Sequence, residues 1–124
     1  VKVFMKKLLC HCGQVEAQIN IEKIDKFLKC NCSICKRKGA VMSMVKNEDF
    51  RIIKGKQMLK IYQFHTKVAK HYFCSICGIY THHNPRSNPS ITGFNIGCID
   101  SINTFQIKEI KVNDGLNHPL DLKK

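Results

Sequence analysis

Seven of the eight cysteines lie in three short motifs, and their spacing constrains the chain more than any other feature of the sequence. The motifs are Cys10-x-Cys12, Cys30-x-Cys32-x-x-Cys35 and Cys74-x-x-Cys77, with Cys98 standing alone. Side chains two positions apart on an extended strand point to the same face, so a C-x-C pair can present both sulfurs to one ion. A C-x-x-C pair followed by glycine, as at 74–78, bends the chain so that two thiolates converge. Zinc takes about four such ligands in a tetrahedron.

Seven clustered thiols predict one closed site with four ligands and one open site with three. A closed four-thiolate site is structural, whereas catalytic zinc keeps an open position. Cys30, Cys32 and Cys35 could reach one ion without help, which leaves the two outlying pairs to complete each other. The competing partition joins the 74/77 pair to two members of the middle cluster, as in a zinc ribbon. Spacing favours the first partition but leaves the second open, and disulfides are a further alternative.

The rest of the sequence predicts one mainly β domain over residues 1–124. Short segments rich in β-branched and aromatic residues are separated by turns containing Gly, Asn or Lys. These segments are residues 1–9, 14–21, 40–45, 50–55, 60–64, 69–74, 90–99 and 105–112. The helix candidates are short, at 21–28 and as a turn at 47–49. No apolar run approaches the roughly 20 residues that span a bilayer. The absence of an export signal favours the cytoplasm, where thiols stay reduced.

The remaining candidate groups give weaker signals. Cys98 is expected to be a buried apolar thiol rather than a ligand. His82 and His83 follow the third motif and could form hydrogen bonds near a site, but a surface or core position is the simpler expectation. His11 lies between two proposed ligands and is expected to point away from their ion. The formal charge of +12 is spread along the chain without a block of like charges, which indicates a solvated basic surface or attraction of an anionic ligand.

Several longer motifs resemble a known family. They are CHCGQV (10–15), CNCSICKRKG (30–39), FCSICGIY (73–80), RSNP (86–89) and NIGCID (95–100). In this order, over nearly the whole chain, they resemble the glutathione-dependent formaldehyde-activating enzyme family, which also includes centromere protein V. The resemblance implies several coiled antiparallel β-sheets stapled by zinc, like the fold of the Rab-accessory zinc proteins. It also implies two zinc ions per chain: a structural ion on Cys10, Cys12, Cys74 and Cys77, and a catalytic ion on Cys30, Cys32 and Cys35.

The activity implied by the resemblance is formation of S-hydroxymethylglutathione, which is classed with the carbon–sulfur lyases. An open zinc position can bind a thiol, lower its pKa and hold it as a thiolate beside an aldehyde carbon. The expected partners are therefore a small thiol such as glutathione and an aldehyde, while the oligomeric state stays open. Because a guanidinium binds a carboxylate with two hydrogen bonds, Arg37 and Arg86 are the candidate contacts for the carboxylates of glutathione.

The alternative function is a non-enzymatic two-zinc module that binds nucleic acid or a protein. The basic charge and the likeness to centromere protein V support it. Two divalent ions held by seven thiolates would lower the formal charge by three, to about +9, which is still basic. No run of basic and aromatic residues forms a stacking platform for bases, and a binding module gains little from an open zinc position. We therefore expect any nucleic-acid binding to be weak and independent of sequence.

Overall fold

The structure is a computed structural model that describes residues 5–117, and it builds this part of the chain from ten short strands and one α-helix. The strands are β1 Met5–Leu9, β2 Glu16–Asn20, β3 Leu28–Cys30, β4 Met42–Lys46, β5 Phe50–Lys54, β6 Leu59–Tyr62, β7 Lys70–Cys74, β8 Tyr80–Asn84, β9 Ile91–Asn95 and β10 Lys111–Asn113. The helix is α1 Ser33–Lys38, and the 3₁₀ turns are η1 Asn47–Asp49, η2 Lys56–Met58, η3 Ile96–Cys98 and η4 Thr104–Gln106.

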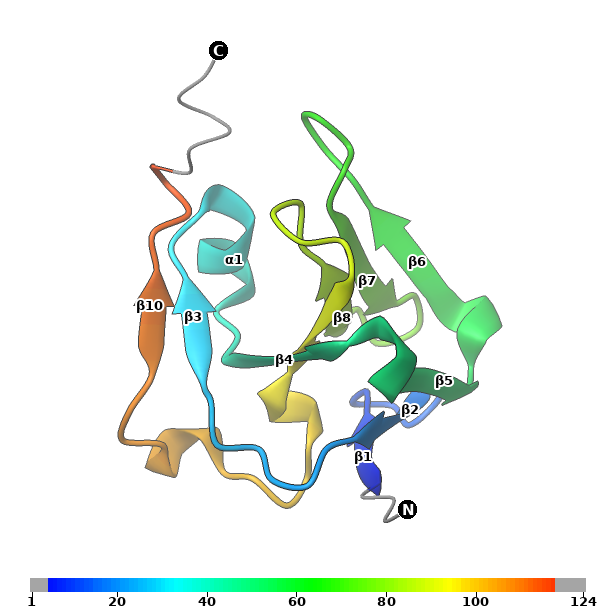
Figure 1. Cartoon of the computed structure of the whole chain (residues 1–124). Coiled ribbons are helices and arrows are strands. Elements are labelled where there is room, and N and C mark those ends of the chain that lie inside the picture. Colours follow the sequence, from blue (N-terminus) through cyan, green and yellow to red (C-terminus); the bar gives the residue numbers. More distant parts are fainter. Residues whose placement is uncertain (1–4, 118–124) are drawn as a thin grey trace.

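The strands form two sheets. The larger has the order β10-β3-β4-β9-β8-β7-β6, and the smaller has the order β1-β2-β5. Every pairing is antiparallel except that of β10 with β3. Figure 1 shows α1 beside β3 and β10 at one end of the large sheet, with β6 and β7 at the other. The fold is therefore mainly β, as predicted.

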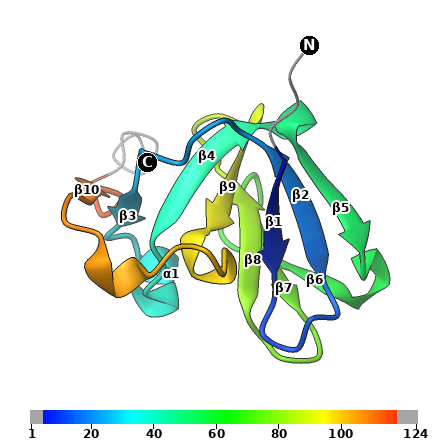
Figure 2. The same cartoon turned by 90° about the horizontal axis from the view of Figure 1, so that it is seen from below.

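The hydrophobic core lies between the two sheets. Its fully buried members include Leu8 of β1, Ile19 of β2 and Phe94 of β9. Figure 2 shows β1 and β2 lying across the large sheet, in front of β8 and β7. Burial of these side chains provides the main hydrophobic stabilisation, at about 1.5–3 kcal/mol for each large apolar group. Only one face of the large sheet is used for this packing.

Cross-strand register gives the two faces of the large sheet different chemistry. His82 pairs with Phe94, which in turn pairs with Ser43, and all three are buried on the core side. Because side chains alternate along a strand, the neighbouring row points to the other side. That row runs from His71 through His83 and Gly93 to Met44, across four adjacent strands. The face away from the core thus carries two imidazoles in register.

The structure corrects one sequence prediction and adds elements that the sequence analysis missed. Residues 21–28 do not form a helix; the chain is irregular there and then enters β3. Ile21, Ile24 and Phe27 have helix-like spacing, but they pack against the core from an irregular segment. The turn at 47–49 is confirmed as η1, whereas α1, β3 and β8 were not predicted.

The predictions for the two ends of the chain and for the segment 105–112 have different outcomes. Residues 1–4 of the predicted first strand, and residues 118–124 of the predicted domain, lie outside the described residues. The segment 105–112 contributes only part of η4 and most of β10. Within residues 5–117, no helix has the length and apolar character needed to cross a membrane.

Candidate functional site

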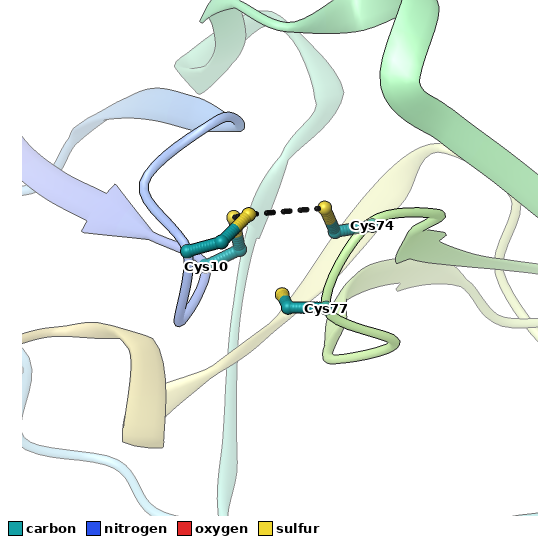
Figure 3. A group of neighbouring side chains, drawn as sticks. Cys10, Cys74 and Cys77 are labelled. Carbon is teal, nitrogen blue, oxygen red and sulfur yellow. Dashed lines mark hydrogen bonds between the residues drawn. The ribbon is translucent and has the colours of Figure 1, made fainter.

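The first group of thiols, here called the four-sulfur cluster, joins two turns that are far apart in sequence. Cys10 and Cys12 lie in the turn between β1 and β2, and Cys74 and Cys77 lie at the turn between β7 and β8. Figure 3 shows Cys74 and Cys77 facing Cys10 from the other turn. All four sulfurs lie within 4.8 Å of one another. The Cys10–Cys12 and Cys12–Cys74 sulfur distances are 3.6 and 3.7 Å. A tetrahedron with zinc–sulfur bonds of 2.3 Å has edges of about 3.8 Å, so this spacing fits zinc.

Local turn chemistry holds the four sulfurs in place. Gly13 and Gly78 adopt positive φ angles of 80° and 76°, which glycine reaches at little cost. Their amides donate to the carbonyls of Cys10 and Cys74 at 3.1 and 2.8 Å. The amide of Val15 donates to the Cys10 sulfur at 3.3 Å. Because one turn belongs to the small sheet and the other to the large sheet, this cluster connects the two sheets.

The second group, here called the three-sulfur cluster, comes from one continuous segment. Cys30 ends β3, Cys32 is the N-cap of α1 and Cys35 lies in its first turn. Their sulfurs lie within 4.8 Å of one another. The amides of Cys32 and Cys35 donate to the sulfurs of Cys30 and Cys32, each at 3.5 Å. The sulfurs thus fall into the two groups that the favoured partition describes, and all eight cysteines are free of disulfides.

Hydrogen bonding makes the thiols of the three-sulfur cluster unequal. The thiol of Cys35 lowers the pKa of Cys32 to about 5. The same contact, together with burial, raises the pKa of Cys35 above its usual range. Burial also raises the pKa of Cys30. A compact set of three sulfur donors matches the soft ligands that zinc takes in proteins.

A cavity of about 650 Å³ opens directly beside the three-sulfur cluster. All three cysteines line it, and its apolar wall is formed by Leu28, Ile34, Met42, Met44, Phe64 and Ile91. His71, His83, Arg86 and Asp114 supply its main polar groups. Both imidazoles come from the row on the outer face of the large sheet. A concave, largely apolar cavity with a few polar groups is the usual form of a small-molecule site.

The structure separates the two arginines that the sequence analysis selected. Arg86 lines the cavity, whereas Arg37 does not. Arg37 lines a second cavity, of about 670 Å³, and its guanidinium donates to the Ser33 carbonyl at 2.9 Å. The position of Arg37 therefore gives its predicted contact with substrate no support. Substrate binding by either arginine stays a prediction.

A polar network that no sequence motif predicted joins two histidines of the cavity to Lys38 and Tyr80. The ammonium of Lys38 lies 2.8 Å from Nδ1 of His71 and 3.8 Å from the centre of the Tyr80 ring. The Tyr80 hydroxyl lies 2.6 Å from Nδ1 of His83. Burial, and then the charge of Lys38, lower the pKa of His71 to about 4 and that of His83 to about 3. Burial also lowers the pKa of Lys38 to about 8. Both imidazoles are neutral at pH 7.

The other groups considered from the sequence take structural positions. His82 is buried on the core side, with its ring centre 4.2 Å from that of Tyr72 and 4.6 Å from that of Phe50. Cys98 is 4% exposed, as expected of a buried thiol, and burial raises its pKa to about 12. His11 is exposed between the two cysteines of its motif.

Comparison with known proteins identifies the family. The model of the glutathione-dependent formaldehyde-activating enzyme family matches residues 5–112. The chain belongs to this family. A crystal structure of a Rhodobacter sphaeroides protein is also similar, with 39% sequence identity over 86% of this chain and 99% of that chain. Its TM-score of 0.82 shows that the two proteins share a fold. The resemblance drawn from the cysteine motifs is thereby confirmed.

Proposed function

We propose that this protein is a zinc-dependent enzyme of the carbon–sulfur lyase class that forms S-hydroxymethylglutathione, or a close analogue, from a thiol and an aldehyde. The observation that carries the proposal is the cavity of about 650 Å³ beside Cys30, Cys32 and Cys35. Family membership supplies the substrate class. Three clustered sulfurs at the wall of a ligand-sized cavity are the arrangement that an open metal site requires.

Two zinc ions per chain fit the donors that are present. The four-sulfur cluster has the donor number and spacing of a closed structural site. The three-sulfur cluster has one donor fewer and borders the cavity. A zinc ion held there would lower the pKa of an incoming thiol and keep it as a thiolate. Such ligands must stay reduced, so we place the protein in the cytoplasm.

The chain's own residues would bind and orient the thiol substrate. Glutathione carries net negative charge at neutral pH, and the formal charge, about +9 with both zinc ions bound, favours its approach. Arg86 lines the cavity and is the residue we assign to a glutathione carboxylate. Arg37 faces a different cavity, and we expect it to contribute less. Holding both reactants in one cavity makes their combination effectively unimolecular.

A calorimetric titration of the zinc-loaded protein tests this proposal. Glutathione should bind, and its S-methyl derivative should bind far more weakly because its sulfur cannot become a thiolate. Binding should strengthen as the pH rises from about 6 to 8, since the free thiol, with a pKa near 8.5, must lose its proton. Equal affinity for the two compounds would mean that the sulfur never reaches the metal.

A second measurement addresses turnover. Exchange NMR with ¹³C-formaldehyde and glutathione should show that the protein accelerates exchange between free aldehyde and adduct. The Cys32→Ser variant is the matched control, and it should lose this acceleration. Failure of the wild-type protein to accelerate exchange, together with sub-micromolar duplex affinity at physiological salt, would favour the alternative of a nucleic-acid-binding module.

A further inference from the structure

Two histidines in the cavity are held by neighbours that fix where each imidazole carries its proton. Lys38 contacts Nδ1 of His71, and Tyr80 contacts Nδ1 of His83. A lysine ammonium has protons to donate and no lone pair to offer, so Nδ1 of His71 must accept. The single proton of this neutral imidazole therefore lies on Nε2.

A tyrosine hydroxyl, unlike an ammonium, can also accept, so the tautomer of His83 is inferred from the acceptor that the Tyr80 hydroxyl needs. Burial raises the pKa of the Tyr80 hydroxyl well above its usual value, so the group stays protonated and can donate. Among residues 5–117, the Tyr80 hydroxyl has one hydrogen-bond partner, Nδ1 of His83, and the hydroxyl proton needs an acceptor. Donation to Nδ1 would satisfy the hydroxyl and place the proton of His83 on Nε2.

Both Nε2–H groups are available to a ligand. Within residues 5–117, neither Nε2 atom has a hydrogen-bond partner. No side-chain nitrogen without a partner is buried in this part of the chain, so both Nε2 atoms are accessible. Both residues line the cavity that the three-sulfur cluster borders. Their rings stack with centres 5.6 Å apart and planes inclined by 14°. Two stacked imidazoles, each with an Nε2 atom that has no partner among the described residues, thus line the same cavity.

The backbone around this pair leaves space for His83. A Cβ atom added to Gly93 would lie 2.2 Å from Cε1 of His83, closer than carbon atoms can approach. Glycine at this position lets the imidazole lie flat against the strand. His82, its neighbour on β8, is equally buried but faces the core and does not line the cavity.

We propose that His71 and His83 bind the oxygen of the aldehyde through their Nε2–H groups and stabilise the negative charge that develops on it. The inference rests on the proposed function. As the thiolate sulfur forms its bond to the carbonyl carbon, the π electron pair moves to the oxygen. The two donors hold that alkoxide, which then takes a proton from water, and the proton that the thiol released to solvent neutralises the hydroxide left behind. Donors aimed at developing charge in a low-dielectric site are a large source of rate enhancement. Lys38 and Tyr80 act as positioning residues that keep each tautomer.

The first test reads the tautomers and does not depend on activity. Two-bond ¹H–¹⁵N spectra of the zinc-loaded protein at pH 7 should show His71 and His83 as neutral Nε2–H forms. Lys38→Met should alter the signals of His71 more than those of His83, and Tyr80→Phe should do the reverse. An imidazolium, or an Nδ1–H tautomer, at either residue in the wild-type protein would overturn the inference.

The second test measures turnover by the same exchange NMR. His71→Leu and His83→Leu should each lower kcat about 10²-fold, with the KM for glutathione within about twofold of wild type. Glutamine carries an N–H donor near the position of Nε2, so His71→Gln should recover part of the rate. His82→Gln is the matched control and should keep the wild-type rate. Equal losses of kcat in the leucine, glutamine and His82 variants would mean that His71 and His83 contribute only packing, and would overturn their catalytic role.

The two tests separate this inference from the proposed function. If the wild-type protein forms no adduct, the proposed function is wrong, and the spectra still decide whether the donor pair exists. If adduct forms at the wild-type rate in His71→Leu and His83→Leu, the proposed function stands, and the proposed role of the two histidines in catalysis is wrong.

Discussion

The two cysteine clusters use the same ligand atom but differ in which parts of the chain they join and in whether they border a cavity. The four-sulfur cluster joins turns of both sheets, with Cys10 and Cys74 buried and Cys12 exposed. The three-sulfur cluster lies within one segment, from the end of β3 into α1, and borders a cavity. The first cluster closes a long loop in the chain, whereas the second closes almost none.

This difference predicts different consequences of metal loss. A cross-link between residues 62 or more positions apart removes much conformational freedom from the unfolded chain. A cluster formed within six consecutive residues constrains the unfolded chain far less. The four-sulfur cluster should therefore contribute folding free energy, and the three-sulfur cluster should contribute chemistry.

The largest effect should follow from removing one ligand of the four-sulfur cluster. Cys74→Ser should unfold or aggregate the domain, because structural zinc contributes its binding free energy directly to folding. Cys32→Ser should lose one zinc ion while keeping most of the circular dichroism spectrum and the cooperative thermal transition. Zinc content and thermal melts of both variants check this, and equal loss of folding in the two would remove the distinction between the clusters.

Chelation should separate the clusters in the wild-type protein. Stepwise addition of EDTA should first remove the ion beside the cavity, with loss of adduct formation but not of secondary structure. Removal of the second ion should coincide with unfolding. Zinc release and circular dichroism recorded on the same samples provide the measurement. Unfolding together with the first ion would contradict the proposed division of roles.

Much of this comparison could be predicted from the sequence. Cysteine spacing alone indicated a three-member group and two pairs, because ligand motifs within a short segment are local properties. The mainly β fold also followed from local composition. The segment 21–28 was predicted wrongly because its apolar spacing suits a helix, while its isoleucines reach the core from irregular chain.

The polar side of the cavity could not be predicted, because it depends on tertiary register. Alternation shows that His82 and His83 face opposite sides of a strand, but not which side holds the core. The contact of Lys38 with His71 joins α1 to β7, and no sequence spacing encodes it. The separation of Arg37 from Arg86 likewise depends on which face of α1 borders the cavity.

A smaller effect should distinguish the two arginines. Arg86→Ala should weaken glutathione binding by about 1.5–3 kcal/mol if a charged hydrogen bond is lost. It should barely change the binding of an uncharged thiol such as 2-mercaptoethanol. Arg37→Ala is the matched control and should change either affinity by less than about 0.5 kcal/mol. Calorimetry with both thiols checks this, and a larger effect of Arg37→Ala would shift the carboxylate site to the other side of α1.

The smallest expected effects come from glycines at the two clusters. A Cβ atom on Gly115 would lie 2.5 Å from the Cys30 sulfur, so Gly115→Ala must displace either the cluster or the segment after β10. It should lower zinc affinity at the three-sulfur cluster about tenfold, within the 1–3 kcal/mol cost of overpacking.

Gly78→Ala meets no atom within 4 Å but keeps a φ of 76°, so it should cost about 1 kcal/mol of global stability. Competition with a zinc-binding dye and urea unfolding measure the two quantities. If Gly115→Ala lowered global stability more than Gly78→Ala, without weakening zinc binding, the three-sulfur cluster would be part of the folding core.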